Sequence, residues 1–326
     1  MRIIENIPQP GAIPQGCVLS IGNFDGVHAG HQQIIARVKS LAEKFDAPSV
    51  IMTFDPHPVA ILHPQRSPGI LTPLEFKQHI IQRFGIDYMI VIKDSFKLLN
   101  MSPAAFIDDF LVNTINPASV VEGDNFNFGY GRSGNSQTLR DMGRQRGFGV
   151  EILNPLKMDI KSQSNVICSS SLIRQLLETG QVADAAALLT RPYKLIGKTV
   201  KGRGKGKELG FPTANIDSEN QIVPDEGVYA GFVYLADDFH SAIESREKIP
   251  AAFSIGRAKT FLTDNPLLVE AHLLVENPGD LYGKYLAMDF IEKIRNQQRF
   301  GSEKELSAQI KRDCDNVLEI LGNFKG

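Results

Sequence analysis

Two histidines, His28 and His31, flank Gly30 directly after the first apolar run of the chain. Imidazole groups placed in this way can hold the oxygens of a triphosphate while an attacking group displaces pyrophosphate from the α-phosphorus. Gly26 and Gly30 let the backbone approach the phosphates closely, because glycine has no side chain. The residue types and their spacing therefore predict a nucleotide triphosphate site.

The segments on either side of these histidines predict how they are positioned. Residues 17–21 form a short apolar run, as a buried parallel strand requires, and apolar residues recur at helical spacing between Ile34 and Phe45. A strand, a turn with glycine and a helix start together form an anion cradle of backbone N–H groups and the positive end of the helix dipole. We expect His28 and His31 at that helix start, although the pattern also fits histidines that only cap a helix or lie on the surface.

Strand and helix patterns alternate up to about residue 155. Such alternation predicts a parallel sheet with helices on both faces and a ligand crevice at the carboxyl ends of the strands. The histidine turn and residues 54–58 both follow such strand ends. Further apolar runs cover residues 49–54, 88–92 and 119–121, and helix starts fall at Thr72, Pro73 and Glu75 and at Ser102 and Pro103.

The second half of the chain has a different pattern. Residues 170–189 are expected to be helical, and residues 190–193 break the helix. Short β-type runs such as 227–234 and 267–275 then predict a small antiparallel barrel or sandwich. A closing helix is expected from the capping box of Ser302 and Glu305 to about Leu321. We place the domain boundary between residues 189 and 190, which gives domains of 1–189 and 190–326.

Residues 123–132 add polar groups and aromatic rings after the apolar run at 119–121. A flat ring system could stack there. Residues 129–134 also match Gly-x-Gly-x-x-Gly, but this copy lies late in the chain and some residues past its strand. We therefore discount it as a dinucleotide-binding fingerprint.

Two further segments have residue types that suit phosphate. Residues 169–171 are serines that begin a helix with Arg174 one turn later, which suits an anionic phosphate chain or simply a capped helix with a surface arginine. Residues 200–215 form a basic, glycine-rich loop without the Gly-Lys-Ser/Thr ending of a Walker A motif. Its glycines and lysines suit a triphosphate, and Thr213 and Asn215 supply oxygens that Mg²⁺ accepts; the alternative is a solvated loop or a nucleic-acid contact.

Length and composition limit the possible functions. The 326 residues suffice for two domains, and a net charge of −2 gives no general attraction for nucleic acid or an anionic membrane. No apolar run approaches transmembrane length. The three cysteines are far apart, without metal-ligand spacing and without a signal peptide ahead of them, which predicts a reduced, cytoplasmic setting. They are Cys17, Cys168 and Cys314.

In order and spacing, these segments resemble the prokaryotic bifunctional riboflavin kinase/FAD synthetase family over nearly the whole chain. The matching segments are residues 22–31, 53–58, 123–126, the serine-rich helix start with Arg174, residues 210–215 and residues 279–283.

The resemblance implies a Rossmann-like nucleotidylyltransferase domain that joins FMN to AMP from ATP and releases pyrophosphate. FMN already carries an anionic nucleophile, so this site chiefly needs charge neutralisation and alignment. The resemblance assigns catalysis to His28, His31, Asn125 and Arg174; ATP binding to Gly22, Asn23, Phe24, Asp25, Gly26, His28, His31, Ser170 and Arg174; and flavin binding to Phe54, Pro56, Pro58, Asn125 and Phe128.

For the second half, the resemblance implies an antiparallel β-barrel, with a C-terminal helix, that phosphorylates the ribityl hydroxyl of riboflavin. Thr213 and Asn215 would hold Mg²⁺ and ATP together with Gly202 and Gly206 of the basic loop. Because a neutral hydroxyl is a poor nucleophile, this site needs a carboxylate base, and the resemblance assigns that role to Glu270. By residue type alone, Glu270 equally fits an outward-facing position on an alternating strand.

The chain departs from the family at residues 253–260. An arginine and a proline of the usual Ala-Asn-Ile-Gly-Thr-Arg-Pro-Thr are absent, and Arg257 and Lys259 are candidates to replace the charge. Two alternatives therefore stay open: an FAD synthetase whose second domain binds flavin but phosphorylates it poorly, and a non-catalytic flavin-binding regulatory protein. The expected partners are riboflavin, FMN and ATP, with no nucleic acid and no membrane. The sequence leaves open whether the chain is a monomer or a transient oligomer.

Overall fold

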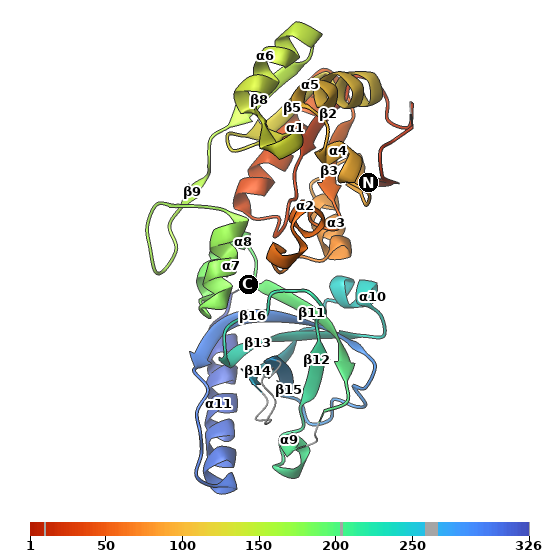
Figure 1. Cartoon of the computed structure of the whole chain (residues 1–326). Helices are drawn as coiled ribbons and strands as arrows, with labels where there is room; N and C mark the ends of the chain where they lie inside the picture. The colour runs from red at the N-terminus through yellow and green to blue at the C-terminus, as the bar shows by residue number, and fades with distance from the viewer. Residues whose placement is uncertain (10, 203–204, 258–266, 326) are drawn as a thin grey trace. The chain divides into compact units, whose positions relative to one another are not determined.

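The computed structural model describes residues 1–9, 11–202, 205–257 and 267–325. They form two compact units (Figure 1). The N-terminal unit contains Met1–Pro68 and Leu74–Lys157, and the C-terminal unit contains Gly69–Pro73 and Met158–Gly326. Residues 158–189 therefore group with the C-terminal unit, while the boundary at 189/190 stays a prediction about function.

The N-terminal unit is built on a six-stranded parallel sheet with the order β1-β4-β3-β2-β5-β8. The order reverses between β2 and β5, so the carboxyl ends of these two strands border the crevice where such sheets bind ligands. The predicted parallel sheet is confirmed. Its strands are β1 (Arg2–Glu5), β2 (Val18–Ile21), β3 (Ser49–Phe54), β4 (Tyr88–Ile92), β5 (Ser119–Gly123) and β8 (Gly149–Leu153).

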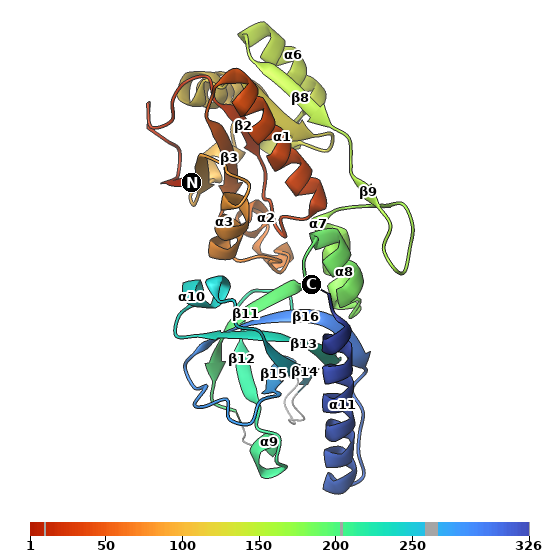
Figure 2. The same ribbon diagram turned by 180° about the vertical axis from the view of Figure 1, so that it is seen from behind.

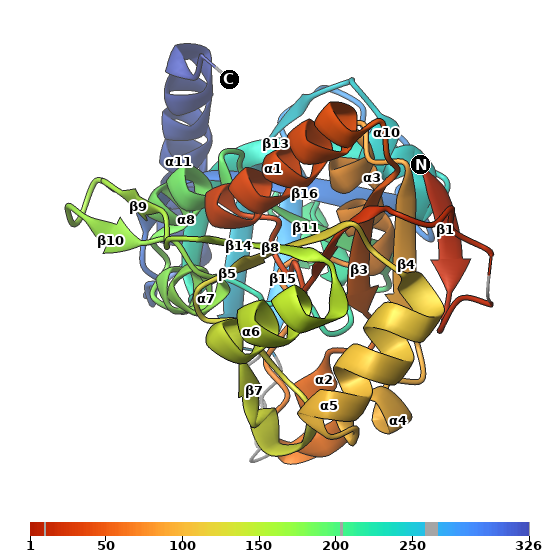
Figure 3. The ribbon, with the colours of Figure 1, turned by 90° about the horizontal axis from the view of Figure 1, so that it is seen from above.

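Helices cover both faces of this sheet (Figure 3). Helices α1 (Ala29–Phe45) and α3 (Leu74–Gln82) lie on one face, and the π-helix η2 (Phe106–Ile115) and α6 (Ser136–Arg146) lie on the other. This division follows from right-handed crossovers that run outward in opposite directions from β2 and β5. The shorter helices are α2 (Pro58–Leu62), η1 (Pro64–Arg66), α4 (Phe96–Leu99) and α5 (Pro103–Ala105).

The Gly-x-Gly-x-x-Gly match at residues 129–134 is not a dinucleotide fingerprint in the structure. It lies in a short antiparallel pair, β6 (Asn127–Phe128) and β7 (Gly134–Asn135), around the 3-10 helix η3 (Tyr130–Arg132). The fingerprint requires a strand, a tight turn and a helix in a βαβ unit. The prediction that residues 129–134 are not a dinucleotide-binding turn is confirmed.

The C-terminal unit opens with a two-stranded sheet and two helices. The sheet pairs β9 (Lys157–Met158) with β10 (Val166–Ile167), and the helices are α7 (Ser170–Glu178) and α8 (Val182–Leu189). The expectation of helix over residues 170–189 is correct except at its centre. Gly180 has a φ of +75° there, in the left-handed region that glycine adopts readily and that ends a helix.

A closed antiparallel barrel with the order β11-β12-β15-β14-β13-β16 forms the core of this unit. Buried side chains such as Tyr229, Phe253 and Phe290 pack inside it, with ring centroids of Phe253 and Phe290 4.9 Å apart. The barrel confirms one of the two predicted architectures. Its strands are β11 (Tyr193–Val200), β12 (Ala214–Asp217), β13 (Gly227–Ala236), β14 (Ile249–Arg257), β15 (Leu267–Leu273) and β16 (Tyr285–Arg295), and two short helices, α9 (Lys205–Glu208) and α10 (Phe239–Glu244), lie between strands.

The closing helix α11 (Glu303–Asn323) packs against β13 and β14 (Figure 2). The predicted cap at Ser302 is confirmed, because Ser302 Oγ accepts a hydrogen bond from Glu305 N at 3.3 Å. The Glu305 side chain accepts from Gly301 N at 3.0 Å, one residue before the N–H that a capping box uses. Nowhere in the part of the chain that the structure describes is a helix both long and apolar enough to cross a membrane.

Candidate functional site

The turn between β2 and α1 has an unusual backbone. Phe24 and Val27 have φ angles of 48° and 40°, which non-glycine residues rarely adopt, and Gly26 has a φ of 87°. The side chains of Phe24 and Val27 are buried, so packing against the core holds the turn in this shape. The buried side chains anchor the backbone of the predicted phosphate turn at the carboxyl end of β2.

His28 and His31 lie together at the start of α1. His28 is the N-cap residue, and its Nδ1 accepts a hydrogen bond from His31 N at 3.4 Å. The two rings stack with centroids 3.7 Å apart, and the ring of Phe24 meets that of His31 edge-on at 5.2 Å. Burial, together with the positive charges of His28 and Lys77, holds the pKa of His31 well below its usual value. This shift favours the neutral imidazole, which can donate one hydrogen bond to an anion.

Two polar atoms beside this turn are buried without a partner. Among the described residues, neither Asn23 Oδ1 nor His31 Nδ1 has a hydrogen-bond partner. A buried polar atom left unpaired costs about 1–3 kcal/mol, so a ligand that pairs with these atoms recovers that cost. The amide of Asn23 contacts His57 through its Nδ2, 3.0 Å from His57 Nε2. The chemistry of these atoms therefore fits a polar ligand at the histidine pair.

Lys77 also lies at this turn, although its sequence pattern did not single it out as a site residue. This residue of α3 is only 5% exposed, and its Nζ donates to the Asn23 carbonyl at 2.8 Å and to Thr53 Oγ1 at 3.3 Å. A signal existed in the sequence, because Lys77 has helical spacing with Ile80 and Ile81, both of which face the core. A lysine on the apolar face of a helix is unusual enough to mark a site.

Glu122 of β5 was missed as well. Its Oε1 accepts a hydrogen bond from Ile21 N at 2.6 Å, beyond the last paired residues of β2 and β5, Leu19 and Val120. The Glu122 side chain thus satisfies a backbone N–H of β2 that no longer pairs with β5, at the point where the two strands separate. Burial raises the pKa of Glu122 well above its ordinary value.

The residues expected to border the flavin have different environments. Phe54 packs against the core at the end of β3, Pro56 is exposed, and Pro58 begins α2. Phe128 is only 6% exposed, with its ring centroid 5.0 Å from that of Phe106. Its neighbour Phe126 stacks on it at 5.6 Å and is partly exposed. This placement favours Phe126 over Phe128 as the ring that a flat ligand can reach.

Asn125, Ser170 and Arg174 complete the residues expected around adenylyl transfer. Asn125 is exposed in the segment after β5 of the N-terminal unit. Ser170 begins α7 in the C-terminal unit, after the N-cap Ser169, and Arg174 Nε donates to the carbonyl of Gly69 at 2.9 Å in the same unit. The common role of these residues with His28 and His31 stays a prediction.

On the barrel, three oxygen-bearing side chains form one row. Asn215 of β12 pairs with Glu270 of β15, and Glu270 pairs with Ser254 of β14. Their sequence neighbours on each strand, such as Ala214 and Val269, are buried inside the barrel, so this row lies on its outer face. Directly opposite residues have Cβ atoms about 5 Å apart, which brings the Glu270 carboxylate close to the Asn215 amide.

The basic loop lies against the same strand. A methyl group at Gly202 would overlap the side-chain amide of Asn215, and one at Gly206 would overlap the Phe211 carbonyl and lie 3.1 Å from Thr213 Oγ1. Both glycines are therefore required by close approach. Arg203 and Gly204 of this loop lie outside the described residues.

The donor set around Asn215 suits a hard divalent cation. Thr213, Asn215 and Glu270 supply hydroxyl, amide and carboxylate oxygens, which Mg²⁺ prefers. Residues 1–9, 11–202, 205–257 and 267–325 contain no cluster of three or more His, Cys, Asp or Glu that could cage a metal ion.

The segment that departs from the family is only partly described. Arg257 ends β14 and forms an ion pair with Glu226, with Nε 3.1 Å from Oε1. Lys259, the other candidate for the replaced charge, lies outside the described residues. The Arg257 side chain is therefore engaged by a carboxylate on the rim of the barrel.

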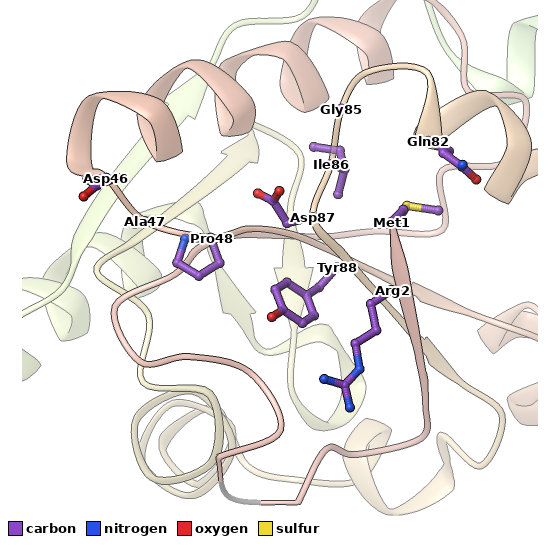
Figure 4. A pocket seen from close by; sticks show the side chains of 10 residues that line it. All are labelled: Met1, Arg2, Asp46, Ala47, Pro48, Gln82, Gly85, Ile86, Asp87 and Tyr88. Atoms are coloured by element: carbon purple, nitrogen blue, oxygen red, sulfur yellow. The ribbon is translucent and has the colours of Figure 1, made fainter.

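A pocket of about 750 Å³ lies elsewhere in the N-terminal unit (Figure 4). Arg2 and Tyr88 begin strands β1 and β4, and Pro48 directly precedes β3, so this pocket is at the amino ends of the strands. Ligand crevices of parallel sheets form at the opposite ends. The pocket is therefore not part of the site at the histidine turn.

Comparison with known proteins agrees with this arrangement. The FAD synthetase family pattern matches residues 11–170, and the riboflavin kinase family pattern matches residues 189–321. The bifunctional riboflavin kinase/FMN adenylyltransferase of Escherichia coli K12 is 33% identical over 326 residues, covering 100% of this chain and 99% of the relative. The Haemophilus influenzae enzyme of the same description is 31% identical over 323 residues, covering 99% and 100%.

A solved structure also has this fold over the full length. A Streptococcus pneumoniae protein described as a macrolide-efflux protein superposes with a TM-score of 0.83 at 25% identity, covering 100% of both chains. The two family matches fall in the order of the parallel sheet and the barrel. The chain therefore belongs to the family of bifunctional riboflavin kinase/FMN adenylyltransferases, with the FAD synthetase domain first and the riboflavin kinase domain second.

Proposed function

We propose that this chain carries out the two activities of its family at two separate sites, one at the histidine turn and one on the outer face of the barrel. The observation that carries the first assignment is the stacked pair His28 and His31 at the start of α1, where Asn23 Oδ1 and His31 Nδ1 are buried with no hydrogen-bond partner among the residues that the structure describes. The second assignment is supported by the row of Asn215 and Glu270 next to the glycine loop.

At the first site, a phosphate oxygen of FMN attacks the α-phosphorus of ATP, and the bond to the bridging oxygen breaks to release pyrophosphate. The attacking oxygen is already anionic, so no side-chain base is needed. His28, His31 and the amino end of α1 stabilise the charge that shifts onto the phosphates. Asn125 arranges the reacting groups, and Phe54, Pro56 and Pro58 border the flavin together with the aromatic pair of Phe126 and Phe128, of which Phe126 is the more exposed.

At the second site, the ribityl hydroxyl oxygen attacks the γ-phosphorus of ATP, and ADP leaves. The Glu270 carboxylate accepts the proton of that hydroxyl. Enzymes of these two classes use ATP and typically a divalent metal ion. We infer that the metal is Mg²⁺, which neutralises phosphate charge when it is bound. Thr213 and Asn215 would hold it together with ATP, and Gly202 and Gly206, which approach Asn215 and Thr213 closely, would bring the loop backbone to the phosphates.

The functional boundary is proposed at residues 189/190 even though α7 and α8 group with the barrel unit. Ser170 and Arg174 suit the phosphates of the adenylyl-transfer site, and the FAD synthetase match extends to residue 170.

We propose riboflavin, FMN and ATP as the partners of this chain, in the cytoplasm. The absence of nucleic-acid and membrane partners is likewise a proposal, supported by the net charge of −2. Cys17, Cys168 and Cys314 are free thiols, which fits a reducing compartment.

The test is a single incubation of the pure protein with riboflavin, ATP and Mg²⁺, followed by chromatographic separation of the flavins. We expect FMN and then FAD. If supplied FMN is adenylylated but riboflavin gives no product, the second domain binds flavin without efficient phosphorylation. If FMN causes no pyrophosphate release, the protein is a non-catalytic flavin-binding protein and the proposal is wrong.

A further inference from the structure

Lys77 is buried in a place where a lysine needs a reason. It lies in the middle of α3, with the buried residues Phe76, Ile80 and Ile81 beside it on the helix. Taking an ammonium group out of water costs several kcal/mol unless oxygens and charges compensate it. Burial accordingly lowers the pKa of Lys77, while the negative charges of Asp25 and Asp55 act in the opposite direction. Lys77 therefore belongs to a polar cluster with Asp25 and Asp55 next to the histidine turn.

The contacts of Lys77 join three elements. Its Nζ donates to the Asn23 carbonyl at 2.8 Å and to Thr53 Oγ1 at 3.3 Å, and Thr53 Oγ1 itself donates to the same carbonyl at 2.9 Å. Asn23 lies in the turn after β2, and Thr53 lies near the end of β3. The carbonyl of Asn23 is thus held by two donors from two other elements.

Holding this carbonyl fixes the orientation of the next N–H group. In a trans peptide the C=O and N–H bonds point in opposite directions. Since the Asn23 carbonyl points at Lys77, the N–H of Phe24 points away from it. Phe24 is also the first residue of the turn with a left-handed φ, so the direction of this peptide sets the course of the turn that follows.

Lys77 also acts on the histidine pair through its charge. The positive charges of Lys77 and His28 face His31, and both add to the effect of burial in lowering the pKa of His31. Asp25 and Asp55 face Lys77 in turn. The positive charge of Lys77 favours the neutral form of the His31 imidazole, and it also favours an anionic ligand at this turn.

We infer that Lys77 is a positioning residue for adenylyl transfer, which fixes the backbone of the phosphate-binding turn by holding the Asn23 carbonyl together with Thr53. This inference rests on the proposed function of the N-terminal unit. Lys77 acts through Asn23, Phe24 and His31, and it has no part in the phosphorylation site on the barrel.

The experiment compares Lys77→Met with the wild type and with Lys44→Met, which removes an exposed lysine of α1. We measure kcat and KM for FMN adenylylation, and the titration of the His31 imidazole by NMR, assigned with His31→Gln. We expect Lys77→Met to lower kcat by about 10²-fold, the scale of a misplacement of about 1 Å, and to raise the pKa of His31. Lys44→Met is expected to change neither, and riboflavin phosphorylation is expected to survive in both variants.

The two readouts keep the inference separate from a merely structural role. If kcat of Lys77→Met matches the wild type, or if it falls while the His31 titration stays unchanged, the inference is overturned. If Lys77→Met does not fold, Lys77→Gln, whose amide still donates but carries no charge, is measured in the same way; we expect the same rise in the pKa of His31 and a smaller fall in kcat, because a donor remains. A wild-type protein that fails to adenylylate FMN contradicts the proposed function instead.

Discussion

Asn215 and Glu270 are direct cross-strand neighbours on the outer face of the barrel, where β12 pairs with β15. The pairing places the amide that we assign to metal-bound ATP beside the carboxylate that we assign as the base. Both side chains alternate with buried residues on strands of a closed barrel, so neither can move far without disturbing the ladder. If Glu270 is the base that we propose, this pairing places it next to the residue that we assign to metal-bound ATP.

Gly202→Ala is expected to weaken ATP binding at the barrel site. The added methyl group overlaps the Asn215 side chain and pushes either the loop or the amide away. We expect the KM for ATP in riboflavin phosphorylation to rise about tenfold, the loss of roughly 1.4 kcal/mol of binding. Steady-state assays check this, with Gly322→Ala in α11 as the control, because a methyl group there meets nothing within 4 Å. An unchanged KM for ATP argues against contact of this loop with ATP.

Metal removal is expected to stop phosphorylation, and Asn215→Ala to shift its metal dependence. After treatment with EDTA, we expect product formation to return on addition of Mg²⁺. The variant should need about tenfold more Mg²⁺ for half-maximal phosphorylation, because it lacks an oxygen ligand or its orienting partner. The Mg²⁺ requirement of FMN adenylylation, titrated in parallel, is the internal control. A variant with the wild-type requirement in phosphorylation excludes Asn215 as a metal-holding residue.

Glu122 is expected to make the N-terminal unit less stable as the pH rises. Its pKa is raised in the folded protein, so the folded state retains a proton that the unfolded chain releases above its ordinary pKa of 4.5. The stabilising contribution is therefore present at low pH and is lost as the pH rises toward the folded pKa, by about 1.4 kcal/mol for each pKa unit.

Denaturant unfolding at pH 5 and pH 8 measures this effect. The decrease in the free energy of unfolding between these pH values should be smaller in Glu122→Gln than in the wild type, since glutamine does not ionise. Glu43→Gln, at an exposed position of α1, serves as the control. Identical pH dependence in Glu122→Gln and the wild type contradicts a protonated Glu122.

Asp313→Ala is expected to destabilise the C-terminal unit strongly. Arg295 of β16 binds Asp313 of α11 with two nitrogens, Nη2 to Oδ2 at 2.7 Å and Nε to Oδ1 at 3.0 Å, and Asp313 is only 3% exposed. Removing one partner leaves a poorly solvated charge, which costs about 3 kcal/mol or more. Urea unfolding of this unit gives the difference. Asp315→Ala, at an exposed position two residues away, should change stability little, and equal effects of the two variants contradict the role of the ion pair.

The sequence predicted those strands and helix starts that depend on residues close together in the chain. The apolar run before the histidines became β2, the serines at 102 and 302 cap their helices, and the alternating runs of the second half became strands of the barrel. The close approach of Gly202 and Gly206 to Asn215 and Thr213 agrees with a loop that needs glycine. In each case the residue type and its neighbours in sequence contain the physical cause.

Features that depend on distant packing were not predicted. Lys77 and Glu122 are buried, and their hydrogen-bond partners lie far away in sequence. Lys77 donates to the Asn23 carbonyl, and Glu122 accepts from the Ile21 amide. The sequence could not show that Phe128, and not Phe126, is the buried ring. A strand of two residues is too short to show an alternation of buried and exposed side chains. The helix break at Gly180 was not predicted either, because it follows from the positive φ of this residue.

The most direct test of two separate sites is the flavin product pattern of His28→Ala and Glu270→Gln, each incubated with ATP, Mg²⁺ and either riboflavin or FMN. We predict that His28→Ala converts riboflavin to FMN and makes FAD at least about 10²-fold more slowly than the wild type. Glu270→Gln should leave riboflavin unconverted and still turn supplied FMN into FAD. Equal loss of both products in either folded variant, or wild-type FAD formation by His28→Ala, would contradict the account.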